Sequence, residues 1–168
     1  MAKIQGIAKL NKTISKQLKP FGITKARLST DYAYYFNSGK VDYKITDGTI
    51  EDRLFNQFVL EKFDYEIEDN FIFSLLHEVG HHKTFEDLTD EEWSYCSQEK
   101  DRIEKEMRDA HTRYAVKKLE YEYFNLIDEM LATSWAVEYA KANPRKVVKM
   151  KKKSHRALKR FYKKNGVV

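Results

Sequence analysis

Residues 71–81 read Phe-Ile-Phe-Ser-Leu-Leu-His-Glu-Val-Gly-His, an apolar run that ends in a His-Glu-x-x-His motif. The run predicts a helix, and residues four apart on a helix lie one above the other, about 6 Å along its axis. His77 and His81 could therefore bind one zinc ion, each at roughly 2.0–2.1 Å. Glu78 would lie beside the metal, where a carboxylate can accept a proton from water. The alternative is a helix whose two histidines are partly buried and hydrogen-bonded.

The composition predicts a single globular domain. A chain of 168 residues can bury a sizeable core, and only 2 Pro and 6 Gly argue against long disordered stretches. The single Cys96 excludes an internal disulfide and suits a reducing compartment. No apolar segment follows Met1 as a signal peptide would require, and no apolar run is long enough to span a membrane. We therefore expect a cytoplasmic protein.

The net charge of +5 is unevenly distributed along the chain. Residues 145–168 contain eleven Lys or Arg and no Asp or Glu, whereas the rest contains 20 basic and 26 acidic residues. The sequence thus predicts an acidic body, residues 1–144, with a basic C-terminal tail.

The N-terminal third predicts one helix and a small sheet. Apolar residues at helical spacing predict a short helix that ends before Pro20. Residues 22–50 contain aromatic and alternating segments, separated by turn signals at 37–39 and at Asp47-Gly48. We expect these segments to form a small antiparallel sheet.

Helices are predicted on either side of residue 65. Thr49 can cap a helix that continues to Phe63, although a strand over 57–63 is an alternative. Asp69 or Asn70 can cap the helix that carries the motif.

A long charged helical segment follows the motif. Leu88–Trp93 has the pattern of a helix start, and apolar positions from Ile103 to Phe124 form a narrow stripe among charges. The helical pattern continues to about Ala142. Because an unbroken helix of that length would be unusual, we expect a break near residues 118–125.

A metal site with two histidines needs at least one more protein ligand, and Glu129 is the candidate. On a helix, Glu129 shares one side with Ala132, Ala136 and Ala140. Small residues beside a ligand let two backbones approach, so a glutamate on this helix could reach a metal on the motif helix. The alternative is a surface glutamate on an amphipathic helix.

The two segments together resemble the ImmA/IrrE-type zinc metallopeptidases, which are frequent in phages and mobile elements. The resemblance lies in His77-Glu78-Val79-Gly80-His81 followed by Glu129-x-x-Ala132-x-x-Trp135-Ala136. A long charged insert, residues 83–123, separates the two motifs here.

This resemblance implies an α+β, mostly helical, zincin-like fold with the small sheet, the motif helix and a later glutamate helix. It implies that His77, His81 and Glu129 bind Zn²⁺ and that Glu78 is the general base of a gluzincin-type metallopeptidase. The substrate would be a protein or peptide. For a phage-encoded protein the location would be the host cytoplasm or the virion.

Several further residues are candidates for supporting roles. Tyr114, Tyr121, Tyr123 and His111 could stabilise an oxyanion, and the sequence does not choose among them.

Three residues lie next to the predicted ligands in the sequence. His82 is expected at the surface or behind the ligands, while Asp128 either orients a histidine or is a solvated carboxylate. Gly80 costs roughly 1 kcal/mol inside a helix relative to Ala, which indicates a close backbone contact at this turn.

The basic tail has several candidate partners. Residues 145–168 could bind nucleic acid, an acidic protein or an anionic membrane surface, or remain solvated. A rival function is therefore a nucleic-acid-associated protein, or a phage virion or host-takeover factor, whose zinc site is structural or vestigial. In an SprT-like variant that acts on DNA-bound proteins, His111 would be the third ligand.

Overall fold

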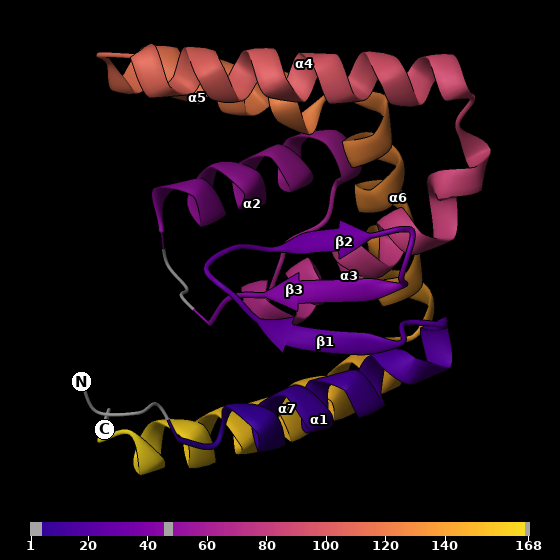
Figure 1. Ribbon diagram of the computed structural model, residues 1–168, viewed down its shortest axis with the longest axis vertical. Helices are drawn as coiled ribbons and strands as arrows, with labels where there is room; N and C mark the ends of the chain where they lie inside the picture. The colour runs from indigo at the N-terminus through magenta and orange to yellow at the C-terminus, as the bar shows by residue number, and fades with distance from the viewer. Residues whose placement is uncertain (1–4, 46–48, 167–168) are drawn as a thin grey trace.

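The computed structural model describes residues 5–45 and 49–166, which form a mostly helical α+β fold (Figure 1). The prediction of this fold class is confirmed. Its elements are α1 (Ile7–Leu18), η1 (Lys19–Phe21), β1 (Lys25–Leu28), β2 (Ala33–Tyr35), β3 (Lys40–Tyr43), α2 (Ile50–Phe63), α3 (Asn70–Thr84), η2 (Phe85–Asp87), α4 (Asp90–Asp109), α5 (Arg113–Phe124), α6 (Ile127–Ala142) and α7 (Pro144–Lys164). No helix in this part of the chain combines the length and apolar character needed to cross a lipid bilayer.

The sheet is mixed, so the prediction of a purely antiparallel sheet was wrong. Its strand order is β1-β3-β2, in which β3 pairs antiparallel with β2 and parallel with β1. The chain leaves β2 through the predicted turn at 37–39 and inserts β3 between the two earlier strands. An alternating pattern reports which residues face the core, but it does not report the direction of the neighbouring strand. The other predicted turn, Asp47-Gly48, lies outside the described residues.

Side-chain caps begin three of the helices at the positions that the sequence predicted. Thr49 and Thr89 each form a capping box with the residue three positions later, at the start of α2 and α4. Asp69 accepts a hydrogen bond from the backbone N–H of Ile72 and caps α3. These bonds satisfy backbone donors that have no partner inside the helix.

Helices α4 and α5 form a hairpin, which corrects the expected long helix. The chain leaves helical geometry at Ala110, well before the predicted break, and Thr112 caps α5. The predicted break near residues 118–125 is confirmed by a second interruption, because α5 ends at Phe124 and α6 begins at Ile127. The apolar stripe continues across the turn because Ile103 on α4 and Leu119 on α5 share one small core. Such a stripe is equally compatible with one straight helix and with two helices folded together.

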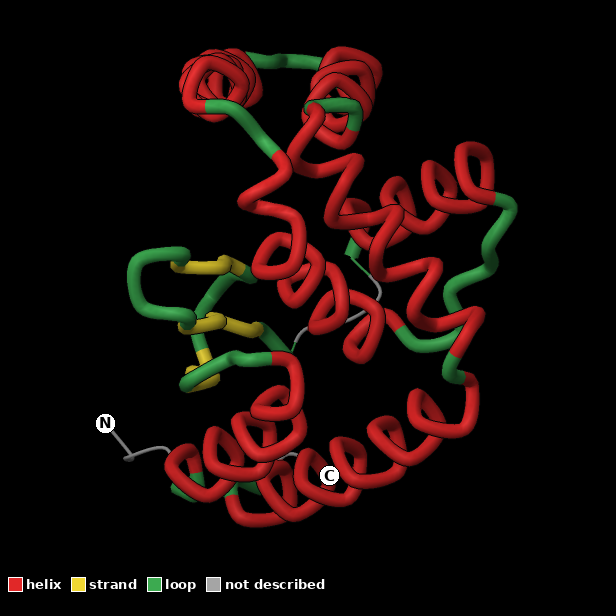
Figure 2. Tube along the Cα trace, turned by 90° about the vertical axis from the view of Figure 1, so that its right-hand side faces the viewer, coloured by secondary structure: helices red, strands yellow, loops and turns green. Residues whose placement is uncertain are grey.

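Helix α3 runs through the middle of the molecule, with α6 against it and the sheet on another side (Figure 2). A Cβ added to Gly80 would lie 2.8 Å from Ala132 Cα and closer still to its carbonyl oxygen. Ala132, Ala136 and Ala140 are all buried. The predicted close backbone contact at Gly80 is therefore confirmed.

Most of the basic C-terminal segment, residues 145–168, belongs to helix α7, which packs along α1 (Figures 1 and 2). Met150, Ser154 and Phe161 are buried on its inner side. The side chain of His155 lies 2.7 Å from Asp69, the residue that caps α3. The basic segment is thus attached to the same helix that carries the motif.

Candidate metal centre

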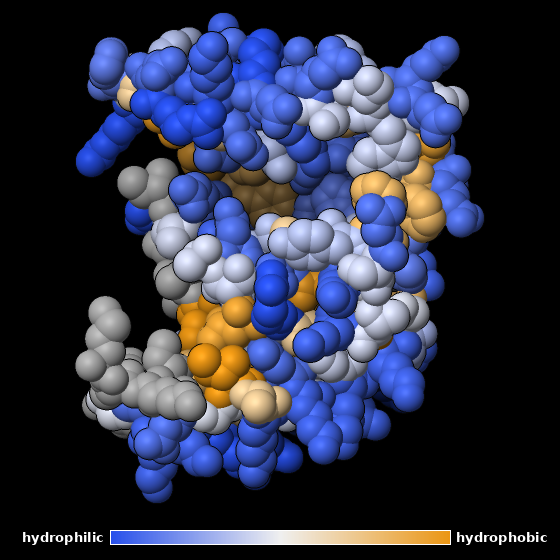
Figure 3. Space-filling view, viewed as in Figure 1, coloured by the Kyte–Doolittle hydropathy of each residue, from blue (hydrophilic) through white to orange (hydrophobic). Residues whose placement is uncertain are grey.

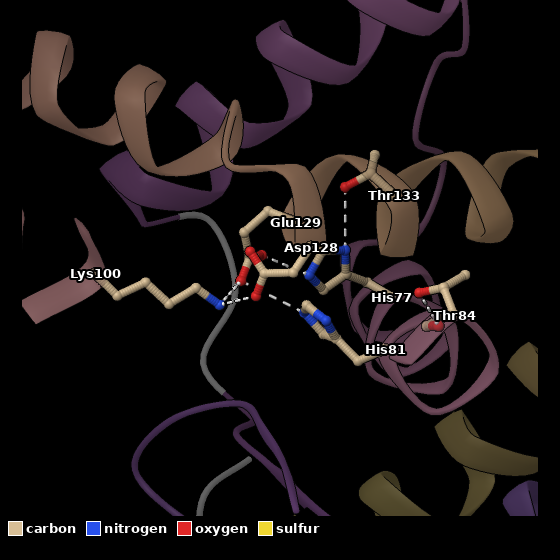
Figure 4. Close-up of polar contacts among 8 residues, drawn as sticks. His77, His81, Thr84, Lys100, Asp128, Glu129 and Thr133 are labelled. Atoms are coloured by element: carbon tan, nitrogen blue, oxygen red, sulfur yellow. Dashed lines mark hydrogen bonds and ion pairs between the residues drawn. The ribbon is translucent and has the colours of Figure 1, made fainter. Parts of the chain in front are cut away.

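Helices α3 and α6 bring His77, His81 and Glu129 together in a group that could hold a metal ion (Figure 4). One donor atom from each residue lies within 4.8 Å of the others. His77 Nε2 is 3.0 Å from Glu129 Oε2, and His81 Nε2 is 3.5 Å from Glu129 Oε1. The side chains are only 8–12% exposed. These are the three residues that the sequence had suggested as ligands.

The close packing of α3 on α6 produces this geometry. Two histidines four residues apart present their rings from successive turns of α3, with centroids 4.7 Å apart. Glu129 lies in the first turn of α6, one turn before Ala132, where the backbones of the two helices meet at Gly80. A larger residue at either contact position would move the carboxylate away from the imidazoles.

A second contact orients His77. Its Nδ1 lies 3.1 Å from Thr133 Oγ1, which is one turn beyond Glu129 on α6. When Nε2 carries the proton, the ring donates to Glu129; when Nδ1 carries it instead, the ring donates to the threonine hydroxyl and the Nε2 lone pair is available for a metal ion. The ring of Phe55 makes a T-shaped contact with the same imidazole, with the ring centroids 5.5 Å apart. His77 is therefore held in position from two sides.

Electrostatics keep Glu129 ionised despite its burial. Burial alone would raise the pKa of this carboxyl, but His81, Lys100 and His77 outweigh it and hold the pKa well below its ordinary value. A carboxylate that is ionised at neutral pH is ready to bind a cation.

Glu78 lies beside the group but outside it. The residue is 6% exposed, and burial raises the pKa of its carboxyl to about 7. Glu129 raises this pKa further, whereas His77 and Lys100 lower it. Glu78 is consequently a base that takes up a proton close to neutral pH.

Lys100 on α4 is the residue at this centre that sequence reasoning missed. Its ammonium lies 2.5 Å from both Asp128 Oδ2 and Glu129 Oε1 (Figure 4). Burial lowers the pKa of Lys100, but Glu129, Tyr123 and Asp128 outweigh it and raise the pKa. A signal was available, because Lys100 lies in the stripe of α4 that holds Cys96 and Ile103, at offsets of four and three.

Asp128 does not have either role suggested for it. It is 2% exposed, which rules out a solvated carboxylate, and its ion pair is with Lys100 rather than with a histidine. Its second oxygen, Oδ1, has no hydrogen-bond partner among the described residues. Asp128 therefore anchors the lysine that contacts Glu129.

The other histidine candidates lie away from the group. His82 Nδ1 is 2.7 Å from the hydroxyl of Tyr34 on β2, so it links α3 to the sheet. His111 is exposed in the turn between α4 and α5. Among the described residues, the group that could hold a metal ion contains Glu129, whereas the SprT-like variant would require His111.

Among the tyrosines proposed for oxyanion stabilisation, Tyr123 is the one that lies near the centre. Its ring is 5.2 Å from the ammonium of Lys100. Tyr114 is 80% exposed on the hairpin, and the hydroxyl of Tyr121 donates to Glu61 on α2.

Comparisons with known proteins add no further assignment. No family model matches the chain, and neither a curated protein nor a solved structure matches it.

Proposed function

We propose that the protein is a zinc metallopeptidase of gluzincin type. The observation that carries this proposal is the convergence of two imidazoles from α3 and one carboxylate from α6, with Glu78 next to them. Two histidines and one glutamate form a ligand set used by catalytic zinc, which keeps a fourth position open for water or substrate.

The spacing of the donor atoms supports zinc. Ligands about 2.0–2.1 Å from a tetrahedral zinc ion are about 3.3 Å from one another. His77 Nε2 is 3.0 Å from Glu129 Oε2 and His81 Nε2 is 3.5 Å from Glu129 Oε1, and one donor atom from each of the three residues lies within 4.8 Å of the others, so the donors are close enough to share one ion. When bound, zinc would lower the pKa of a coordinated water and polarise a substrate carbonyl.

Glu78 has the position and the basicity of a general base. It follows His77 directly on α3 and is buried, and its pKa of about 7 suits proton transfer near neutral pH. In the proposed reaction Glu78 accepts the proton of the attacking water and delivers it to the leaving amine.

Strand β2 offers a place for an extended substrate. It lies at the edge of the sheet and, among the described residues, pairs on one side only, with β3. Figure 3 shows the surface hollowed between the α4–α5 hairpin and the sheet. A peptide could add to such an edge through backbone hydrogen bonds, which would favour polypeptides over small substrates.

Metal analysis tests the ligand set. We expect about one zinc per chain in the purified protein and a large loss of zinc in Glu129→Ala. Glu138→Ala is the matched control, because Glu138 is an exposed glutamate on the same helix. Equal zinc content in all three proteins would show that Glu129 is not a ligand.

Peptide hydrolysis tests the catalytic role separately. Glu78→Gln should keep its zinc and lose at least about a hundredfold in the rate of casein hydrolysis, which is the contribution of a general base. A variant that retains zinc and full activity would contradict the assignment of Glu78. Wild-type protein that binds zinc but cleaves nothing would favour a structural metal site.

A further inference from the structure

Helices α1 and α7 lie side by side and antiparallel at one end of the molecule, opposite the α4–α5 hairpin (Figure 1). The amide of Gln17 donates to Ser154 Oγ at 2.8 Å, and the backbone of Gln5 contacts Asn165 near the other end of the pair. The two helices therefore form one surface, although they come from opposite ends of the sequence.

This surface carries charge of one sign. The two helices contain fourteen Lys or Arg and no Asp or Glu. All 26 acidic residues lie between Asp31 and Glu138. Lys9, Lys12 and Lys16 are exposed along one side of α1, and ten of the eleven basic residues of α7 are exposed. We call these fourteen residues the cationic platform.

The positive charges of the platform are almost entirely unpaired. Within the described part of the chain, Lys151 is the one platform residue that forms an ion pair with a carboxylate, and its ammonium lies 3.9 Å from Asp69. Like charges three or four residues apart on a helix repel one another. A polyanion would relieve this repulsion and release its own counterions.

A lipid surface fits the platform poorly. A helix that lies in a membrane interface inserts its apolar side into the lipid. Met150 and Phe161 of α7 are instead buried in the protein core, and Val148 is the one large apolar side chain of the pair that is strongly exposed. A protein partner also fits poorly, because lysine is depleted at protein interfaces while aromatic residues are enriched.

A duplex fits better than a single strand. Proteins that bind single strands stack bases on exposed aromatic rings, and no strongly exposed aromatic residue lies on α1 or α7. Helix α7 has 21 residues, which corresponds to about 32 Å and thus to roughly one turn of B-DNA. Eight of its eleven basic residues are lysines, which suit phosphates rather than paired contacts to bases.

We propose that the cationic platform binds the phosphate backbone of double-stranded nucleic acid without sequence preference. Both helices take part, so the binding surface includes α1 as well as the basic C-terminal segment. The platform is separate from the metal centre, and its function does not depend on peptidase activity.

Binding of the full chain to a 30-base-pair duplex of arbitrary sequence tests the proposal. We expect Lys152→Gln, Arg156→Gln and Arg160→Gln together to weaken binding at least about tenfold near 0.1 M salt. The magnitude of the slope of log affinity against log salt concentration should decrease by about 2.7, because three phosphate contacts are lost and each contributes about 0.9 for B-DNA. Lys9→Gln, Lys12→Gln and Lys16→Gln together should have a similar effect.

The matched control replaces Lys105, Arg108 and Arg113 of the α4–α5 hairpin, which are exposed and carry the same charges. It should bind as the wild type does, and all variants should keep their far-ultraviolet circular dichroism. An equal loss of duplex affinity in the control variant would overturn the proposal that the platform binds the duplex. Unchanged affinity in the α1 variant would overturn the participation of both helices.

Other ligands distinguish the alternatives. A DNA duplex and an RNA duplex compared directly will show which duplex is preferred. Tighter binding to single strands, binding only to phosphatidylserine vesicles, or binding only to a second copy of the chain would each overturn the proposal.

Discussion

Lys100 has two buried carboxylates as partners, and its ammonium contacts one oxygen of the candidate ligand Glu129. The other oxygen of Glu129 lies toward His77. This arrangement keeps the ligand ionised and limits its rotation. It would also place a positive charge next to a bound cation, so we expect Lys100 to weaken the affinity of the candidate centre for a metal ion.

Loss of this ammonium should be costly because it leaves Asp128 buried without a counter-charge. We expect Lys100→Met to lower the free energy of unfolding by about 2–3 kcal/mol at pH 7, measured by urea denaturation. Adding Asp128→Asn should recover part of that loss, so the double variant should be less destabilised than the sum of the single variants. Lys105→Met, at an exposed position on α4, is the control. Additive effects would mean that the two residues do not interact.

Glu120 on α5 should make stability depend on pH. Burial raises its pKa to about 7, with further contributions from Glu51 and Asp31. The folded state therefore holds a proton that the unfolded chain releases near pH 4.5, and stability falls as the pH rises from about 4.5 to about 7.

Glu120→Gln removes this dependence. At pH 8 the variant should be more stable than the wild type by about 1 kcal/mol, a modest value because the side chain is partly exposed and screened. Near pH 4 the two proteins should be equally stable in thermal denaturation. Glu104→Gln, at an exposed position, should show no difference at either pH. If Glu120→Gln were less stable than the wild type at pH 8, the raised pKa of Glu120 would be contradicted.

At the scale of elements, the distance between α3 and α6 decides whether the centre exists. The backbones of the two helices are in close contact at Gly80 and Ala132. The histidines and the glutamate lie within one turn of this contact, so a small separation of the helices would move the donor atoms apart.

Gly80→Ala should therefore be destabilising, although alanine is the better helix former by about 1 kcal/mol. The added Cβ meets backbone atoms of α6, which cannot rotate away, and such overpacking typically costs about 1–3 kcal/mol. We expect a lower midpoint in thermal denaturation and weaker zinc binding in the same protein. A more stable variant with normal zinc content would show that the helices are not in close contact.

At the scale of the whole molecule, charge is divided between two ends. The cationic platform lies at one end, and the rest of the chain, which includes the candidate metal centre, contains all 26 acidic residues and the other 17 basic residues. If both proposals hold, a duplex on the platform would bring polypeptides bound to the same duplex near the centre without competing for it. The two activities can be lost separately, because the variants that test them alter different elements.

Much of the local structure could be predicted because its causes lie within a few residues. The threonines before α2 and α4 and the aspartate before α3 cap helices through bonds that span three positions. The two motif histidines share a helix face for the same reason. The small-residue side of α6 indicated a close approach to another helix, and Glu129 was the acidic residue beside it.

Other features depended on residues far apart in the sequence. The parallel pairing of β1 with β3, the hairpin of α4 with α5 and the position of Lys100 each require a choice among packings that local patterns leave open.

By itself the sequence determined the capped starts of α2, α3 and α4, the histidine pair and the uneven distribution of charge, since hydrophobic periodicity and capping act over one or two turns. Only the tertiary structure decided that Lys100 contacts Glu129 and that the basic segment joins α1 in one surface. These pairs are 29 and more than 130 residues apart. Their contacts arise because burying apolar surface selects one packing of the whole chain.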